Sequence, residues 1–216
     1  DDAACWVVAD GLGGHRGGAV ASRLAVDTIL GSFHQNRTLS PAAISGHVFA
    51  ANQAVLSRQR EDSEFSQART TVVVLVSDYR SCLWAHVGDS RLYHFRGGRL
   101  LSQTKDHSVP QAMADAGEIS GDRIRYHEDR NRLLRTLGME GELRPAASTQ
   151  AVRLREDDAF LLCVDGFWEY VLETEMGVDL AKSACSGDWL TKMEARILRR
   201  AKDGHDNYTA VAVLCS

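Results

Sequence analysis

The sequence has no surplus of positive charge, no paired-cysteine motif and no long apolar run. Its 25 Lys and Arg residues are outnumbered by 29 Asp and Glu, which gives a formal net charge of -4 and argues against nucleic acid as a partner. The five cysteines are irregularly spaced and form no CxxC pair, so neither a disulfide framework nor a zinc knuckle is expected. No apolar run approaches the roughly 20 residues that span a bilayer. The composition therefore predicts a protein with no nucleic-acid partner and no membrane partner.

The glycine-rich segment near the start matches no nucleotide-binding fingerprint. From Gly11 it reads Gly-x-Gly-x-x-Arg, so the third glycine of a dinucleotide site is missing. From Gly13 the GxxxxG spacing is followed by Ala19 instead of Lys, which excludes a P-loop. The acidic start carries no signal-peptide pattern, and Cys82 and Cys163 lie in apolar stretches as small core residues of a reducing compartment do. We therefore expect a cytoplasmic protein.

The chain of 216 residues is long enough for one sizeable domain, and it contains no repeat or linker, so we expect a single domain over residues 1–216. Helices are predicted over 18–33, 41–60, 109–116, 173–184 and 189–202, and strands over 5–9, 70–77, 82–87, 92–95, 99–102, 159–164 and 208–214. Helices come in adjacent pairs and strands in adjacent hairpins, which favours an α+β fold with antiparallel sheets. The polar segment 120–135 predicts a long exposed excursion that is open to motion.

Four aspartates are predicted to stand at the ends of apolar strands. Each is followed by a small or polar residue, in the pairs Asp10-Gly11, Asp89-Ser90, Asp165-Gly166 and Asp206-Asn207. A carboxylate at the end of a buried strand is costly to desolvate unless a cation compensates it, and Lys and Arg are scarce immediately beside these four. Carboxylates without basic partners are the ligands that hard divalent cations prefer. A lone Asp-Gly pair is usually a turn, so it is the recurrence of the pattern that predicts a metal site.

The order of these motifs resembles that of the PP2C-type (PPM) metal-dependent protein phosphatases, in their bacterial branch. The likeness covers nearly the whole chain and rests on ADGLGGH (9–15), GDSR (88–91), KDHS (105–108), AGEI (116–119), Arg130-Asn131 with Leu137-Gly138, VDG (164–166) and Asp206-Asn207. It implies a four-layer α/β/β/α sandwich, in which two mainly antiparallel sheets are flanked by helix pairs. It also implies a centre of two Mg²⁺ or Mn²⁺ ions, with a third, weaker site in many members.

The resemblance also implies roles for individual residues. Asp10 would bridge both ions, the Gly11 carbonyl would bind one of them, and Asp165 and Asp206 would hold the second. Asp10, Asp165 and Asp206 are thereby the implied catalytic residues, while Asp89 with Asp165 matches the third site. Two ions ~3.5–4 Å apart lower the pKa of a bridging water and clamp the phosphoryl oxygens. The resulting hydroxide attacks phosphorus in line, so no protein nucleophile is needed.

Two departures from the family pattern affect this interpretation. The family carries an Arg that grips the substrate phosphate, and an acid, on a strand before the Ala-Asp-Gly segment. Only residues 1–5 precede Trp6 here, so we expect the N-terminal strand to be missing from this chain. Many eukaryotic members have a histidine directly after Asp-Gly that is regarded as a general acid, whereas this chain has Leu12. His15 is then either an acid or a loop residue that orients the glycine turn.

The resemblance implies hydrolysis of phosphoserine and phosphothreonine in proteins, in opposition to a bacterial Ser/Thr kinase. The expected partner is a phosphorylated protein, either a kinase or its target, and the enzyme is expected to be a monomer. Segments 133–138 and 165–169 look similar to phosphatases that accompany type VI secretion systems. Segment 120–135 matches the family's mobile flap, which helps choose substrates.

Two other functions remain open at this point. The missing N-terminal strand motivates a pseudo-phosphatase that binds phosphoproteins without turnover, although the four intact aspartates argue against it. Another two-metal hydrolase, such as a nuclease, is disfavoured by the low basic content.

Overall fold

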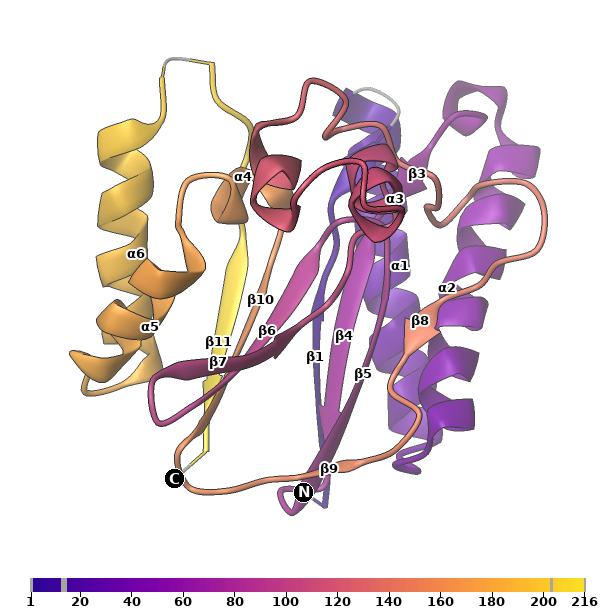
Figure 1. The fold of residues 1–216 in the computed structure, drawn as a ribbon. Helices are drawn as coiled ribbons and strands as arrows, with labels where there is room; N and C mark the ends of the chain where they lie inside the picture. Colours follow the sequence, from indigo (N-terminus) through magenta and orange to yellow (C-terminus); the bar gives the residue numbers. More distant parts are fainter. Residues whose placement is uncertain (1, 13–14, 203, 216) are drawn as a thin grey trace.

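Two β-sheets lie face to face in the computed structural model, which describes residues 2–12, 15–202 and 204–215. A helix pair covers the outer face of each sheet, α1 and α2 on one side and α5 and α6 on the other (Figure 1). The first sheet has the strand order β1-β4-β5-β8, with β9 also paired to β5, and the second has the order β11-β10-β6-β7. Neighbouring strands in both sheets are antiparallel. The four-layer α/β/β/α fold expected from the sequence is thereby confirmed.

The elements of the described residues follow the predicted order. The strands are β1 (Ala4–Val8), β2 (Gly11–Leu12), β3 (Arg69–Thr70), β4 (Val72–Ser77), β5 (Ser81–Val87), β6 (Arg91–Arg96), β7 (Arg99–Gln103), β8 (Ala146–Ala147), β9 (Val152–Arg153), β10 (Asp158–Cys163) and β11 (Ala210–Leu214). The helices are α1 (His15–Gln35), α2 (Pro41–Glu61), α3 (Val109–Asp115), α4 (Asp165–Trp168), α5 (Glu173–Ala181) and α6 (Ser186–Arg200), with 3₁₀ turns η1 (Ser63–Phe65) and η2 (Gly121–Tyr126). The short elements β2, β8, β9, η1, η2 and α4 were not predicted, and the predicted strand 70–77 is interrupted at Thr71.

Strand β4 shows why its sequence is almost wholly apolar. Successive side chains of a strand point to opposite faces. Val72, Val74 and Val76 pack in the core beneath α1 and α2. Val73 and Leu75 point the other way and pack between the two sheets. Because both faces of β4 are buried, no position in it is left for a polar side chain until the strand ends.

Strand β10 plays the same part in the second sheet. Leu161 and Cys163 pack against Trp189 of α6, whereas Phe160 and Leu162 fill the space between the sheets. The antiparallel pairing of the strands places the ends of β1, β5 and β10 and the start of β11 at one edge of the sandwich (Figure 1). The residues that follow β1, β5 and β10, and those that precede β11, are therefore brought to the same edge.

The excursion over residues 120–135 is less exposed than the sequence indicates. Its η2 turn buries Ile124 and Arg125, whose exposed fractions are 6% and 8%. Arg125 donates to the Val171 carbonyl oxygen at 3.2 Å and makes two 2.8 Å bonds to the Glu173 carboxylate. The prediction of an exposed segment is confirmed for most of these residues, but Ile124 and Arg125 are buried, because the arginine finds acceptors on the chain that leads into α5.

All five cysteines are free thiols. Burial raises the pKa of both Cys5 and Cys82 to about 12, so these thiols stay protonated at neutral pH. Among the residues that the structure describes, no helix combines the length and apolar character needed to cross a membrane.

Candidate metal centre

Asp10 lies just beyond β1, and its backbone is held by two threonines. The Asp10 carbonyl oxygen accepts hydrogen bonds from the Thr71 amide at 2.8 Å and from the Thr70 hydroxyl at 2.7 Å. The Asp10 amide donates to Thr71 Oγ1 at 3.2 Å, and that hydroxyl also pairs with Ser90 Oγ at 2.7 Å. The interruption between β3 and β4 thus serves a purpose, because Thr71 ties Asp10 to the segment that carries Asp89.

The glycine after Asp10 and the glycine after Asp165 are both required by close packing. A Cβ on Gly11 would lie 2.1 Å from the Gly18 carbonyl oxygen, so β2 lies directly against the first turns of α1. A Cβ on Gly166 would lie 2.2 Å from the carbonyl oxygen of Asn207. This second contact presses the start of α4 against the turn that carries Asp206. The family resemblance implies that the Gly11 carbonyl also binds a metal ion, and this stays a prediction.

Asp89 is buried at the end of β5, with an exposed fraction of 5%. Its carbonyl oxygen accepts a 2.9 Å bond from the indole of Trp168. The preceding Gly88 has a φ of 100°, and a Cβ there would come within 2.6 Å of the Thr71 side chain. The Gly88 amide donates to Nδ1 of His107 at 3.1 Å, and its carbonyl accepts from the His107 amide at 2.9 Å. His107 therefore fixes this loop.

The carboxylates at this edge interact with one another. Burial raises the pKa of Asp10, and the negative charge of Asp206 raises it further. Burial and the charge of Asp10 raise the pKa of Asp165 to about 7. The pKa of Asp89 lies well above its usual range because of burial and the charge of Asp165. Within the described part of the chain none of the four makes an ion pair, so only protons or cations can relieve this repulsion.

The donor set fits hard divalent cations. The negative charge of Asp206 raises the cost of ionising Asp10, and the charges of Asp10 and Asp206 raise that of Asp165, so a bound divalent cation would relieve their repulsion. In residues 2–12, 15–202 and 204–215, no three or more His, Cys, Asp and Glu side chains already stand in ligand positions around one point. Oxygen donors of this kind suit Mg²⁺ and Mn²⁺. Binding such ions would therefore require the carboxylates of the described residues to move into ligand positions.

The arginine nearest to these acids in sequence is directed elsewhere. Arg91 makes two 2.7 Å bonds to the carboxylate of Asp106. Its guanidinium lies over the ring of Trp168, 3.6 Å from the centroid. These contacts give Arg91 a structural role. The acids consequently keep no basic partner from their own loop.

Sequence reasoning missed the cationic side chains that surround the acids. A cavity of about 360 Å³ is lined by Asp165 and Asp206 together with Arg130, Arg200 and Lys202. These cations come from the excursion and from the end of α6, far from the acids in the sequence. Only the Arg130-Asn131 pair carried a signal, as part of the family resemblance. The side chain of His15, considered as a general acid, lies outside the described residues.

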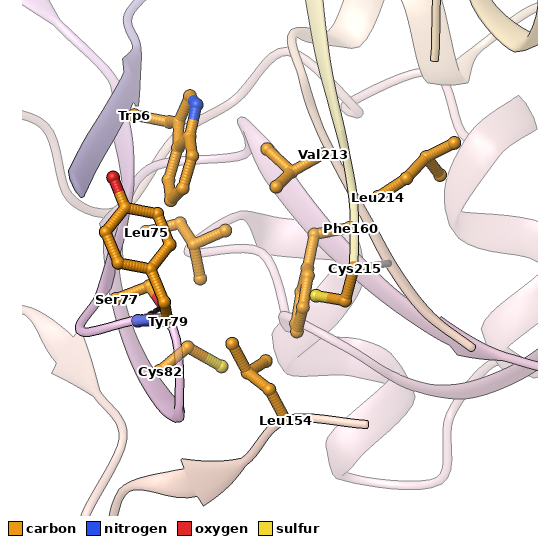
Figure 2. A pocket seen from close by; sticks show the side chains of 10 residues that line it. All are labelled: Trp6, Leu75, Ser77, Tyr79, Cys82, Leu154, Phe160, Val213, Leu214 and Cys215. Carbon is orange, nitrogen blue, oxygen red and sulfur yellow. Dashed lines mark hydrogen bonds between the residues drawn. The ribbon is translucent and has the colours of Figure 1, made fainter. Parts of the chain in front are cut away.

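An apolar cavity of about 260 Å³ lies between the two sheets, away from the acids. Figure 2 shows its wall of mainly hydrophobic side chains from both sheets, and the residues that line it are Trp6, Leu75, Ser77, Tyr79, Cys82, Leu154, Phe160, Val213, Leu214 and Cys215. This wall contains no carboxylate or basic side chain. It therefore offers nothing that could bind a metal ion or a phosphoryl group.

Comparison with known proteins identifies relatives over the whole molecule. The family described as protein phosphatase 2C matches residues 1–202. The serine/threonine phosphatase stp of Listeria welshimeri is 32% identical over 214 residues, which cover 96% of this chain and 82% of that protein.

Solved structures agree with this result. The serine/threonine phosphatase PstP/Ppp of Mycobacterium tuberculosis superposes with a TM-score of 0.82 at 26% identity, over 100% of this chain and 93% of that one. A catalytic domain of PstP in complex with two manganese ions also gives 0.82, at 24% identity, over 100% and 92% of the two chains. PppA of Pseudomonas aeruginosa, described as a key regulatory component of a type VI secretion system, gives 0.79 at 26% identity, over 97% and 86%.

Proposed function

The chain belongs to the protein phosphatase 2C family, and from that premise we propose that Asp10, Asp165 and Asp206 hold the metal ions with which it works. It is a metal-dependent protein-serine/threonine phosphatase of the bacterial type, with Mg²⁺ or Mn²⁺ as its cofactor. Its substrates are phosphoproteins. In the proposed arrangement Asp10 would contribute to both ions and the Gly11 carbonyl to one of them. Asp165 and Asp206 would hold the second ion, and Asp89 with Asp165 would form a weaker third site.

One observation carries this assignment. Carboxylates that follow β1 and β10 and precede β11 meet at one edge of the sandwich, and burial and mutual repulsion raise the pKa values of Asp10 and Asp165. Bound ions supply a water of lowered pKa and a clamp for the phosphoryl oxygens. The chain's own contribution is to hold the acids close together without basic partners, so that their charge is compensated by cations. The backbone bonds from Thr70 and Thr71 keep Asp10 in place for that purpose.

The assignment is tested by removing single carboxylates. We expect Asp10→Ala and Asp165→Ala each to lower Mn²⁺-dependent hydrolysis of p-nitrophenyl phosphate by at least about 10²-fold, because each removes charge on which the ions depend. Asp27→Asn is the matched control, since Asp27 is exposed on α1 and, among the residues that the structure describes, forms its ion pair with Arg23 at 3.3 Å. Near-normal activity in either alanine variant would refute the assignment.

A second candidate is a phosphoprotein-binding module without turnover. It is favoured by the absence of a preformed cluster of three or more ligating side chains within the described residues. Calorimetric titration with Mn²⁺, combined with an assay of hydrolysis, separates the two functions. A phosphatase binds the ion and hydrolyses p-nitrophenyl phosphate. A binding module shows no tight binding of Mn²⁺ and retains affinity for a phosphopeptide without hydrolysing it.

We further propose that the enzyme works in the cytoplasm as a monomer, against a bacterial Ser/Thr kinase. The five free thiols suit a reducing compartment. The likeness to PppA supports a link to type VI secretion. Incubation with autophosphorylated Ser/Thr kinase domains tests the proposed opposition to a kinase. The expected result is loss of phosphate from the kinase or its target.

A further inference from the structure

A second cavity adjoins the one that contains the acids. The first cavity, of about 360 Å³, and the second, of about 500 Å³, share the four lining residues Arg130, Glu169, Tyr170 and Arg200. The second cavity continues beneath the excursion, where its wall adds Arg125, Tyr126 and Leu172. Together the two form a single groove, called here the flanking groove, that begins at Asp165 and Asp206 and leads away from them.

Among the described residues of the groove wall, the arginines form ion pairs and one basic side chain does not. Arg130 is paired with Glu169 at 2.5 Å, and Arg200 is paired with Glu175 at 2.5 Å. Lys202 lines the same cavity, is exposed, and makes no ion pair with any residue that the structure describes. The excursion above the groove adds no surplus, because Arg125 and Arg130 are paired with Glu173 and Glu169 and its other three arginines are matched by three acids. Once cations neutralise the metal-site acids, Lys202 therefore leaves the groove with a positive charge.

The floor of the groove suits an extended peptide. Tyr126 is 72% exposed and Leu172 is 36% exposed, and both line the second cavity with Tyr170. Tyr126 is held there because its neighbour Arg125 is fixed to Glu173 by two 2.8 Å bonds. Exposed aromatic and aliphatic side chains beside fixed charges are typical of surfaces that bind another chain.

We propose that the flanking groove binds the peptide chain next to the phosphorylated residue and selects acidic side chains there. The contacts are Lys202 and the exposed side of Arg200, while Tyr126 and Tyr170 support the peptide backbone. This inference rests on the proposed function, because the phosphorylated residue itself must reach the acids at the end of the groove. A partly exposed charge pair of this kind gives a preference of roughly twofold to fivefold per acidic residue.

The test compares phosphopeptides that differ only in flanking charge. One phosphothreonine peptide is made with Glu, Gln or Lys at the two positions on each side in turn, and kcat/KM is measured for the Mn²⁺-loaded enzyme. The wild type should prefer Glu to Gln by roughly twofold to fivefold, and Lys should be the poorest. The preference should shrink as salt is raised, because exposed pairs are screened. Lys202→Glu should invert the order.

The control is Arg199→Glu, which makes an equivalent charge change one residue before Arg200 on the same helix. Arg199 is exposed and lines neither cavity, so this variant should keep the wild-type order. Ratios are compared within each variant, so a change in overall activity cancels.

Two outcomes would overturn the inference. One is equal kcat/KM for the three wild-type peptides. The other is an equal change of order in the Arg199 and Lys202 variants, which would assign the preference to the general charge of the helix. In both cases Mn²⁺-dependent hydrolysis of p-nitrophenyl phosphate, which has no flanking chain, would leave the proposed function standing. If the wild type showed no Mn²⁺-dependent hydrolysis of either the phosphopeptides or p-nitrophenyl phosphate, the proposed function itself would be refuted.

Discussion

At the scale of single residues, Asp165 shows that the site holds a carboxyl group where its ionisation is unfavourable. Burial and the charge of Asp10 raise the pKa of Asp165 to about 7, compared with roughly 3.9 in an unfolded chain. Between these values the folded, metal-free protein binds a proton that the unfolded chain does not bind. The contribution of Asp165 to the free energy of unfolding must therefore fall as the pH rises from about 4 to about 7.

The Asp165→Asn variant tests this reasoning. In EDTA at pH 8 it should unfold at a temperature several degrees above that of the wild type, a gain of about 1–3 kcal/mol, because the amide removes the charge. The amide oxygen can still accept the 2.7 Å bond from the Gly166 amide. Near pH 4 the difference should disappear, since both side chains are then neutral. Thermal unfolding at several pH values measures this, with Asp27→Asn as control, and a less stable variant at pH 8 would contradict it.

The same residues show what could be predicted from the sequence. Asp10, Asp89 and Asp165 stand where apolar stretches end, so their positions were visible without a structure. The prediction that Asp206 also ends a strand is wrong, because Asp206 lies in the turn before β11. The partners of the adjacent glycines were not visible. Gly11 meets Gly18, and Gly166 meets Asn207 across 41 residues of sequence, through backbone contacts that only the tertiary fold creates.

At the scale of elements, the excursion over residues 120–135 is fastened to the chain that follows Asp165. Arg125 binds Val171 and Glu173, and Arg130 binds Glu169, so two arginines hold alternate residues of one segment. That segment begins with α4, whose Trp168 donates to the Asp89 carbonyl. The sequence did not predict this arrangement, because the polar, weakly patterned excursion gives no sign of acceptors nearly 50 residues away.

The Arg125→Ala variant should release the excursion. Loss of its two charge-assisted bonds to Glu173 should lower the free energy of unfolding by about 2 kcal/mol. It should also make residues 120–135 more sensitive to limited proteolysis and raise KM for a phosphopeptide more than KM for p-nitrophenyl phosphate. Arg123→Ala is the control, because Arg123 is exposed on the same turn. Unchanged proteolysis in the Arg125 variant would show that the excursion is held by other contacts.

At the scale of the whole molecule, the acids come from both halves of the sandwich. Asp10 and Asp89 follow β1 and β5 of the first sheet, whereas Asp165 follows β10 and Asp206 precedes β11 of the second. Ions held by these four would join the two sheets at the edge where the acids repel one another. The α+β class was predictable because helix pairs and hairpins follow one another along the chain, and the four layers were implied by the family resemblance. The meeting of the four acids depends on how the sheets face each other.

Mn²⁺ should therefore stabilise the entire fold and not the loops alone. At a free concentration 100 times its Kd, an ion that binds only the folded state adds about 2.7 kcal/mol to the free energy of unfolding. The gain should be larger at pH 8 than at pH 5.5, because the ion must displace protons from carboxyls of raised pKa. Thermal unfolding with Mn²⁺ or EDTA at both pH values measures it. Asp10→Ala should lose most of the gain while Asp27→Asn keeps it, and an equal gain in both variants would mean that the ion binds somewhere other than between the sheets.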